Sequence, residues 1–580
     1  MSTSKKVVSY VVRGILFLAY IALSLYLTFP TLHFKNENAI GWVALTVVIG
    51  FLLFGCWGQF KGVLEGLEGM LTGKKGYAGG SGAKKNTALK VLAVILAVLG
   101  VYMVFGFLSS LHFFRAKDYA AQMELKELSM EEFGTTISPE SIGSSTLPII
   151  DESISMRKAE GALGTYGSQF TLGGSNTLIH VNTDKGEELV RVIPLEYSGF
   201  FVALNKYSTG SVGYVKVNVV TEETELVLVD GGMPYLESGL LNYNLHRYVW
   251  MHYPTAMVTE YSFEIDDEGH PYWIVTYYDR EVGLFGGEEP KGVILVNATS
   301  GEIEKYPMGK EPSWVDRVVP VDIAYAQSDN ALTYKNGWFN VEFGAKKDVF
   351  NLTEEYNYIS IDGETYMYSG ITSPNNADET SVGFVLVNLK TKETLRYTMS
   401  GITEYRAKSI AEGDQKVKAQ ALTATDPILI NIENTPTYFL TLKNGYQRLW
   451  YCLVRVSDGT VVLSEDLKSA KTEYLSIVTE SGATSDLEGE DLKSVQGRVL
   501  RVRENAAENS LEFILEEHPE KLYVAPFALK TSVRFTKEGD VVSFKYIESG
   551  DGSALVRAFT NETVEKFEAQ KDEASENEAR

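Results

Sequence analysis

Three long apolar segments near the N-terminus constrain this 580-residue chain more than any other feature. They are Ile15–Phe29, Trp42–Trp57 and Val91–Leu108. A helix rises about 1.5 Å per residue, so about 20 residues cross the hydrocarbon core of a bilayer, and all three segments are candidate spans. A cleaved signal peptide is the alternative for the first segment, because Lys5 and Lys6 give it a charged start. Its long apolar run and the second segment that soon follows favour an uncleaved anchor.

The charges around these segments predict their orientation, because short loops rich in lysine and arginine tend to stay in the cytoplasm. Lys5, Lys6 and Arg13 precede or begin the first segment, whereas the loop over residues 30–41 holds one lysine and one glutamate. The loop before the third segment holds Lys61, Lys74, Lys75, Lys84, Lys85 and Lys90. We therefore expect a multi-pass protein of the plasma membrane, with a cytoplasmic N-terminus and everything after about Leu111 outside the cytoplasm.

The charge of the chain divides in the same place. Residues 1–113 carry ten of the 53 basic residues and three of the 76 acidic ones, so this head is +7 and the remaining body is −30. A strongly acidic body is a poor match for nucleic acid, whose binding requires cations that neutralise phosphates. Cys452 is the one cysteine of the body, so its stability is expected to come from packed cores and not from disulfides.

A repeated string predicts how the body is built. The stretch GVILVNATSGEIEKY (Gly292–Tyr306) returns as GFVLVNLKTKETLRY (Gly383–Tyr397) and, more loosely, as GYVKVNVVTEETELV (Gly213–Val227). In each copy a β-type run meets an asparagine, a short polar segment and a second β-type run, which is the pattern of a hairpin. The shared asparagines are Asn218, Asn297 and Asn388, and we interpret them as turn residues because this side chain bonds readily to nearby backbone.

Helix-like segments precede the hairpins, so the sequence predicts about four α-β-β-β units with antiparallel sheets over residues 151–466. A helix, a strand and a "VN-x-x-T-x-E" hairpin resemble PepSY-type domains, and Val296–Glu302 (VNATSGE) is the closest match. Glu222 and Lys392 replace the glycine of this motif in the other copies. The resemblance implies non-catalytic modules outside the membrane, in a bacterial protein.

The other parts of the chain complete an α+β fold. We expect a three-helix transmembrane head over residues 1–113, a helix and linker over 114–150 and another over 467–490. Five short β-type runs over 491–563 predict a small OB-like β-barrel, and the charged residues 564–580 predict a disordered tail.

Motifs for chemistry are scarce. The seven histidines include no H-E-x-x-H motif, the cysteines offer no zinc site, and there is no G-x-S-x-G elbow. The acidic Asp266, Asp267 and Glu268 are calcium candidates, but DDEG between two strands is already a good turn. We therefore predict no catalytic residue, no metal and no cofactor, and expect that the protein is not an enzyme.

Two sets of residues are candidates for contacts. Trp273, Tyr277, Tyr278 and Phe285 could form an aromatic binding surface, although aromatic residues on strands are more often core. A glycine stripe at spacings of three and four residues indicates close helix packing, either within the head or in a homo-oligomer. The stripe consists of Gly55, Gly58, Gly62, Gly66 and Gly69.

These features predict a membrane-anchored, extracytoplasmic binding or scaffold protein that recognises a protein, peptide or envelope polymer, with the lipid bilayer as its second partner. Two alternatives stay open. One is an accessory subunit of a membrane transport or sensing complex, and the other is an envelope hydrolase whose active site is assembled from dispersed residues.

Overall fold

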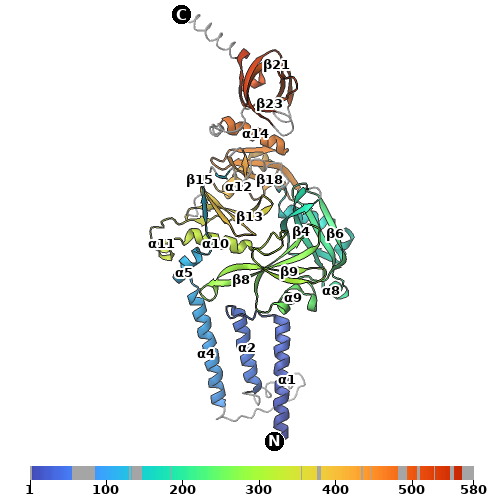
Figure 1. The fold of residues 1–580 in the computed structure, drawn as a ribbon, viewed down its shortest axis with the longest axis vertical. Coiled ribbons are helices and arrows are strands. Elements are labelled where there is room, and N and C mark those ends of the chain that lie inside the picture. The colour runs from blue at the N-terminus through green and yellow to red at the C-terminus, as the bar shows by residue number, and fades with distance from the viewer. Residues whose placement is uncertain are drawn as a thin grey trace.

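The structure is a computed structural model in which three helices, a mixed α+β body and a terminal barrel follow one another along the longest axis (Figure 1). The N-terminal helices and the barrel lie at opposite ends of the molecule. The described residues are 3–54, 85–129, 132–133, 147–183, 186–354, 356–374, 380–432, 435–445, 447–480, 493–505, 510–527, 529–548 and 554–564.

The three N-terminal helices are α1 (Thr3–Thr28), α2 (Glu37–Phe54) and α4 (Lys85–Ser109). Their apolar stretches of 22, 18 and 20 residues are each long enough to cross a membrane. At most 17% of any of these stretches is buried inside the protein, so apolar side chains cover the outside of the helices. The prediction of three apolar helices that can span a membrane is confirmed.

Four sheets form the body, and each follows a helix. In every sheet four consecutive strand positions lie side by side in chain order, as an antiparallel meander. The sequence predicted three strands per unit, and the structure adds one. The helices are α7 (Glu152–Ala162), α9 (Leu245–His252), α10 (Val321–Thr333) and α12 (Glu404–Gly413). We call the four units 1 to 4.

The strands of the four units have these bounds. Unit 1 contains β2 (Phe170–Leu172), β3 (Thr177–Thr183), β4 (Gly186–Tyr197), β5 (Ser211–Asn218) and β6 (Thr224–Met233). Unit 2 contains β7 (Met257–Ile265), β8 (Pro271–Val282), β9 (Gly286–Asn297) and β10 (Ile303–Pro307). Unit 3 contains β11 (Asn351–Leu352), β12 (Asn357–Ile361), β13 (Glu364–Thr372), β14 (Thr380–Asn388) and β15 (Thr394–Ile402). Unit 4 contains β16 (Thr423–Ala424), β17 (Ile428–Ile432), β18 (Thr435–Asn444), β19 (Gln447–Arg455) and β20 (Val461–Ser464).

The first strand position is divided in three of the units. In unit 1 both β2 and β3 pair with β4, at its two ends. In the same way β11 and β12 pair with β13, and β16 and β17 pair with β18. The extra strand of each unit lies in the segment between the helix and the repeated hairpin.

The segment after the third membrane helix differs from the predicted helix and linker. A short helix, α5 (His112–Ala120), is followed by a strand, β1 (Lys126–Leu128). This strand pairs in parallel with β15 at the edge of the unit 3 sheet. The chain that leaves α4 is thus tied directly to the body.

The repeated letters have a local structural cause. Asn297 Oδ1 accepts hydrogen bonds from the backbone N–H groups of Thr299 and Ser300, and Asn218 and Asn388 make the same pair of bonds in their turns. The backbone N–H of each asparagine donates to the carbonyl oxygen of the glutamate five residues on. The predicted turn role of the asparagines is confirmed, and the residue four positions after each has a positive φ.

The cores join the units in pairs. One cluster of buried apolar side chains combines the sheets of units 1 and 2, including Val192, Val215, Phe263 and Trp273. A second cluster combines units 3 and 4 and includes Tyr438. Burial of apolar surface between sheets therefore holds unit 1 to unit 2 and unit 3 to unit 4.

A helix and a five-stranded closed barrel end the described chain. The helix is α14 (Leu467–Glu480), which packs on the unit 4 sheet. Around the barrel the strand order is β21-β22-β23-β25-β24. These strands span Lys493–Asn505, Ser510–Leu515, Tyr523–Pro526, Ala554–Asn561 and Val541–Glu548, in that order, and the short helix α15 (Thr531–Arg534) lies between β23 and β24 in the chain.

Unit 2 is the part of the body that contacts the membrane helices most closely. The β8–β9 hairpin reaches the end of α4, where the Phe285 backbone N–H donates to Ser110 Oγ at 2.8 Å. Arg280 on this hairpin pairs with Glu37 at the start of α2. On the other side Trp250 of α9 donates its indole N–H to the carbonyl oxygen of Pro30, just beyond α1, at 2.8 Å. The body is therefore fixed to the ends of all three helices.

Candidate functional site

The four predicted aromatic residues do not form one binding surface. Trp273 is fully buried in the core shared by units 1 and 2, and its indole N–H donates to the Tyr235 carbonyl oxygen at 2.9 Å. Trp273 is therefore a core residue, which is the alternative that the sequence analysis gave for aromatic residues on strands. Tyr277 is partly exposed, and Lys305 Nζ lies 3.8 Å from the centroid of its ring.

Of the other two aromatic residues, only Phe285 is shown in contact with a membrane helix. Burial raises the pKa of the partly exposed Tyr278 to about 12. The Phe285 ring contacts α4, with its centroid 6.1 Å from that of Tyr102, so this residue is part of the attachment of the body to the membrane head. The glycine stripe Gly55, Gly58, Gly62, Gly66 and Gly69 lies outside the described residues.

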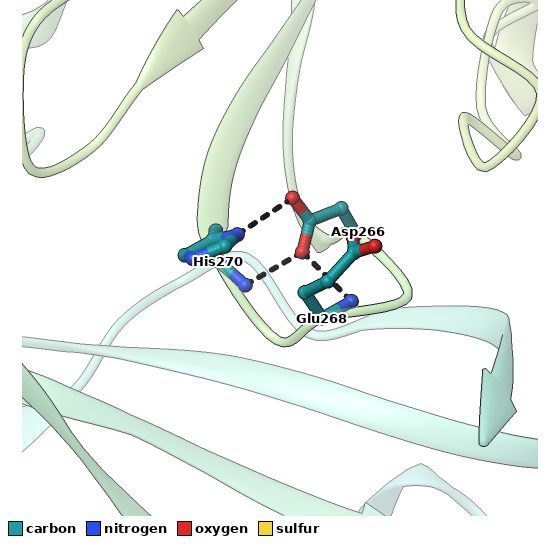
Figure 2. Close-up of side chains that lie close together, drawn as sticks. All are labelled: Asp266, Glu268 and His270. Atoms are coloured by element: carbon teal, nitrogen blue, oxygen red, sulfur yellow. Dashed lines mark hydrogen bonds and ion pairs between the residues drawn. The ribbon is translucent and has the colours of Figure 1, made fainter. Parts of the chain in front are cut away.

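The calcium candidates lie in the turn between β7 and β8, where Asp266, Glu268 and His270 approach one another (Figure 2). Asp266 Oδ1 accepts the backbone N–H groups of Glu268 and His270, and its Oδ2 lies 2.9 Å from His270 Nδ1. Asp267 Oδ1 accepts the Asn182 backbone N–H at 3.0 Å, which ties the turn to unit 1. These hydrogen bonds account for Asp266 and Asp267 as turn and packing groups, which is the interpretation that the sequence favoured.

A cavity of about 510 Å³ lies where units 1, 3 and 4 meet. Its walls include the start of α7, Leu178 of β3, Tyr358 of β12 and Phe439 of β18. This volume is within the range of sites for small ligands, and the walls carry both apolar and polar side chains. The cavity is therefore the best candidate for a ligand site.

Charges of both signs line this cavity. Lys443 pairs with Asp151, the residue that caps α7, and its Nζ lies 2.6 Å from Ser153 Oγ. Arg191 is 8% exposed, and one of its terminal nitrogens donates to Asn176. Burial lowers the pKa of this guanidinium group. Among the residues that the structure describes, no atom accepts a hydrogen bond from Arg191 Nε.

A second cluster joins units 1 and 3 beside the cavity. His180 of β3 lies between two partners: its Nδ1 is 3.1 Å from Asp316 Oδ2, and its Nε2 is 2.6 Å from Ser360 Oγ of β12. Asp316 is in the segment before α10, and its backbone N–H donates to the buried Glu264 at 3.0 Å. Burial raises the pKa of Glu264. The Ser360 hydroxyl, the His180 imidazole and the Asp316 carboxylate thus form a chain of hydrogen-bonding contacts.

Sequence reasoning missed both the cavity and this cluster. His180, Asp316 and Ser360 come from three separate segments, 136 and 180 residues apart from the histidine. A local sequence motif cannot reveal a cluster that is built from such distant segments. One available signal was the position of Arg191, a charged residue within the otherwise apolar run Leu189–Leu195.

Comparisons with known proteins give no family. The sequence matches no known protein family and no curated protein. Among solved structures, two variants of Synechocystis apocarotenoid oxygenase align at 10% and 9% identity, each over 51% of this chain. The alignments span 60% and 65% of those proteins, and both TM-scores are 0.16, so they carry no argument about fold or activity.

Proposed function

We propose that this protein is a membrane-anchored, extracytoplasmic binding protein that takes up a short peptide, or a peptide end, in the cavity among units 1, 3 and 4. The observation that carries this proposal is a pair of cationic side chains, Arg191 and Lys443, in the wall of one cavity.

The charges of the cavity favour a ligand that carries both signs. Arg191 and Lys443 suit a carboxylate, since a guanidinium and an ammonium both form strong charge-assisted bonds to it. Glu152 and Asp426 line the same cavity and suit an ammonium group. Tyr358 and Phe439 offer apolar contact between the charges. A free peptide in its zwitterionic form combines these groups in one small molecule.

We predict that a defined pool of short peptides binds the full-length protein in detergent, and that Arg191→Met weakens this binding at least tenfold. The physical reason is that a hydrogen bond to a charged group contributes about 1.5–3 kcal/mol. Saturation-transfer NMR on the pool, followed by titration of the strongest peptide, measures the effect. Amidating the carboxyl end of that peptide should reproduce the loss.

The control is Arg498→Met, which removes an exposed arginine from the distant barrel. This variant should bind the peptide as the unmodified protein does. If no peptide in the pool binds at millimolar concentration, or if Arg191→Met binds as tightly as the control, the cavity is not a peptide site.

Exposed apolar side chains at the membrane-facing end support the anchoring. Phe200 and Phe201 of α8 (Phe200–Asn205) are 64% and 77% exposed. Tyr207, just after this helix, contacts Tyr243 of the short helix η3 (Leu241–Tyr243), and Asn242 there accepts the hydroxyl of Tyr26 in α1. Apolar residues at this level fit the boundary between headgroups and acyl chains.

The orientation is part of the proposal, and the lysine-rich segment before α4 supports a cytoplasmic N-terminus. We predict that a cysteine introduced by Glu520→Cys, on the exposed β22–β23 connection, reacts with a membrane-impermeant maleimide in intact protoplasts. The native Cys452 is fully buried in unit 4, so it should not react while the protein is folded. Labelling only after permeabilisation would place the body in the cytoplasm.

We also propose distant kinship for two parts of the chain. The helix and antiparallel strands of each unit, with the asparagine turn of units 1 to 3, support a PepSY-like module. The barrel order β21-β22-β23-β25-β24, with β23 parallel to β25, supports an OB-like barrel. An extracytoplasmic, acidic barrel suits contact with protein better than with nucleic acid.

A further inference from the structure

We propose that Ser360, His180 and Asp316 form a nucleophilic site that cleaves carboxylic esters or related acyl compounds. The hydroxyl of Ser360 lies 2.6 Å from His180 Nε2, and Asp316 Oδ2 lies 3.1 Å from His180 Nδ1. A nucleophile within hydrogen-bond reach of a base, which a third group orients in turn, is the arrangement that activates a serine.

The surrounding hydrogen bonds fix the imidazole. Asp316 Oδ2 accepts the backbone N–H of His180 at 2.6 Å as well as facing its Nδ1. The backbone N–H of Asp316 is held in turn by Glu264. Since a carboxylate accepts hydrogen bonds, Nδ1 carries the proton and Nε2 presents its lone pair to the Ser360 hydroxyl.

Burial differs within the cluster in the way that a nucleophilic site requires. His180 and Asp316 are each 6% exposed, whereas Ser360 on the edge strand β12 is only partly buried. The base and the positioning carboxylate are therefore shielded from water, and the nucleophile stays within reach of a substrate. Glu187, with Oε1 4.0 Å from His180 Nε2, adds a negative charge that stabilises the imidazolium once it forms.

The cavity lies next to this cluster. Leu178 and Tyr358 line the cavity, and they precede His180 and Ser360 by two positions on their strands. Residues two apart on a strand share a face and lie roughly 7 Å apart. One part of a substrate can therefore occupy the cavity while its carbonyl group lies at Ser360. The guanidinium of Arg317 lies 4.2 Å from the centroid of the Tyr358 ring.

The reaction balances without any further reagent. Ser360 Oγ attacks the carbonyl carbon of the ester while its proton passes to His180 Nε2. The tetrahedral intermediate then collapses, the bond from carbon to the alkoxy oxygen breaks, and the alcohol leaves with the proton from His180. Water attacks the acyl-serine with His180 again as the base, which releases the carboxylic acid and restores the hydroxyl. Ser360 and His180 are the catalytic residues, and Asp316 is a positioning residue.

The test is covalent labelling of the full-length protein in detergent with a fluorophosphonate, which phosphonylates activated serines. We expect one adduct per chain by intact mass, and peptide mapping should place it on Ser360. Ser360→Ala should abolish the adduct, and His180→Gln should slow its formation about 10³-fold or more. Ser494→Ala, which removes an exposed serine of the barrel, should leave the labelling unchanged.

Turnover of p-nitrophenyl butyrate distinguishes a positioning role of Asp316 from a purely structural one. Asp316→Asn should lower kcat strongly and leave KM nearly unchanged, since Asp316 does not touch the substrate. The fluorophosphonate adduct forms without any peptide, whereas the peptide titration uses the unlabelled protein, so the acyl site and the peptide site fail independently. Two results would overturn the proposal: a folded wild-type protein, with an intact thermal transition, that does not label, or an adduct mapped to another serine. The mapping uses the wild-type protein, so it does not depend on the folding of any variant.

Discussion

Thermal unfolding of the full-length protein in detergent should begin roughly 10 °C lower when Trp273 is replaced by alanine. The indole is fully buried between the sheets of units 1 and 2, with the Phe263 ring 5.2 Å away between centroids. Truncation of a buried tryptophan costs about 3–5 kcal/mol through lost burial and the cavity that remains. It also leaves the carbonyl oxygen of Tyr235 without its indole donor.

Tyr277→Ala is the matched control, because Tyr277 lies on the same strand but is only partly buried. Its loss should lower the transition by a few degrees at most. Circular dichroism at a β-sheet wavelength follows unfolding without depending on the removed indole. A Trp273→Ala protein that melts within a degree or two of the control would mean that the buried core between units 1 and 2 does not limit stability.

The periodic features of the fold were predictable from the sequence because they arise from local physics. Apolar runs long enough to span a bilayer identified three helices, and five short β-type runs predicted a small barrel. The asparagine turns were predictable because the side chain of Asn297 bonds to backbone two and three residues further on. A repeat with such a local cause can be recognised in the amino-acid sequence.

The remaining features depend on contacts between distant segments. Arg455 stands where the other units have asparagine, yet its N–H donates to the Thr460 carbonyl oxygen with the same five-residue spacing. The fourth turn therefore keeps the backbone hydrogen bond of the other three turns, but its sequence lacks the asparagine. Trp273 illustrates the opposite case, because a strand of aromatic residues does not reveal which of its faces another sheet covers. The cavity and the Ser360 cluster form only when units 1 and 3 meet.

The first glycine of the repeated string gives the second large expected effect. Gly292 has a φ of 143°, and a Cβ there would lie 2.1 Å from the carbonyl oxygen of Tyr306 on β10. Gly213 and Gly383 have the same close approach to the next strand, and each lies beside a shift in strand register. The glycine therefore permits a close strand pairing in all three copies.

Gly292→Ala should lower the stability of unit 2 by about 3 kcal/mol, because a strained backbone costs about 1–3 kcal/mol and the clash with Tyr306 adds to it. The weakened pairing should expose the connection between β9 and β10. Limited proteolysis should therefore cut the variant there sooner than the unmodified protein. The control is Gly174→Ala, where no atom lies within 4 Å of the added Cβ and the backbone needs no positive φ. Equal proteolysis of the two variants would show that β9 and β10 pair without the close approach at Gly292, and the repeated glycines would then need another explanation.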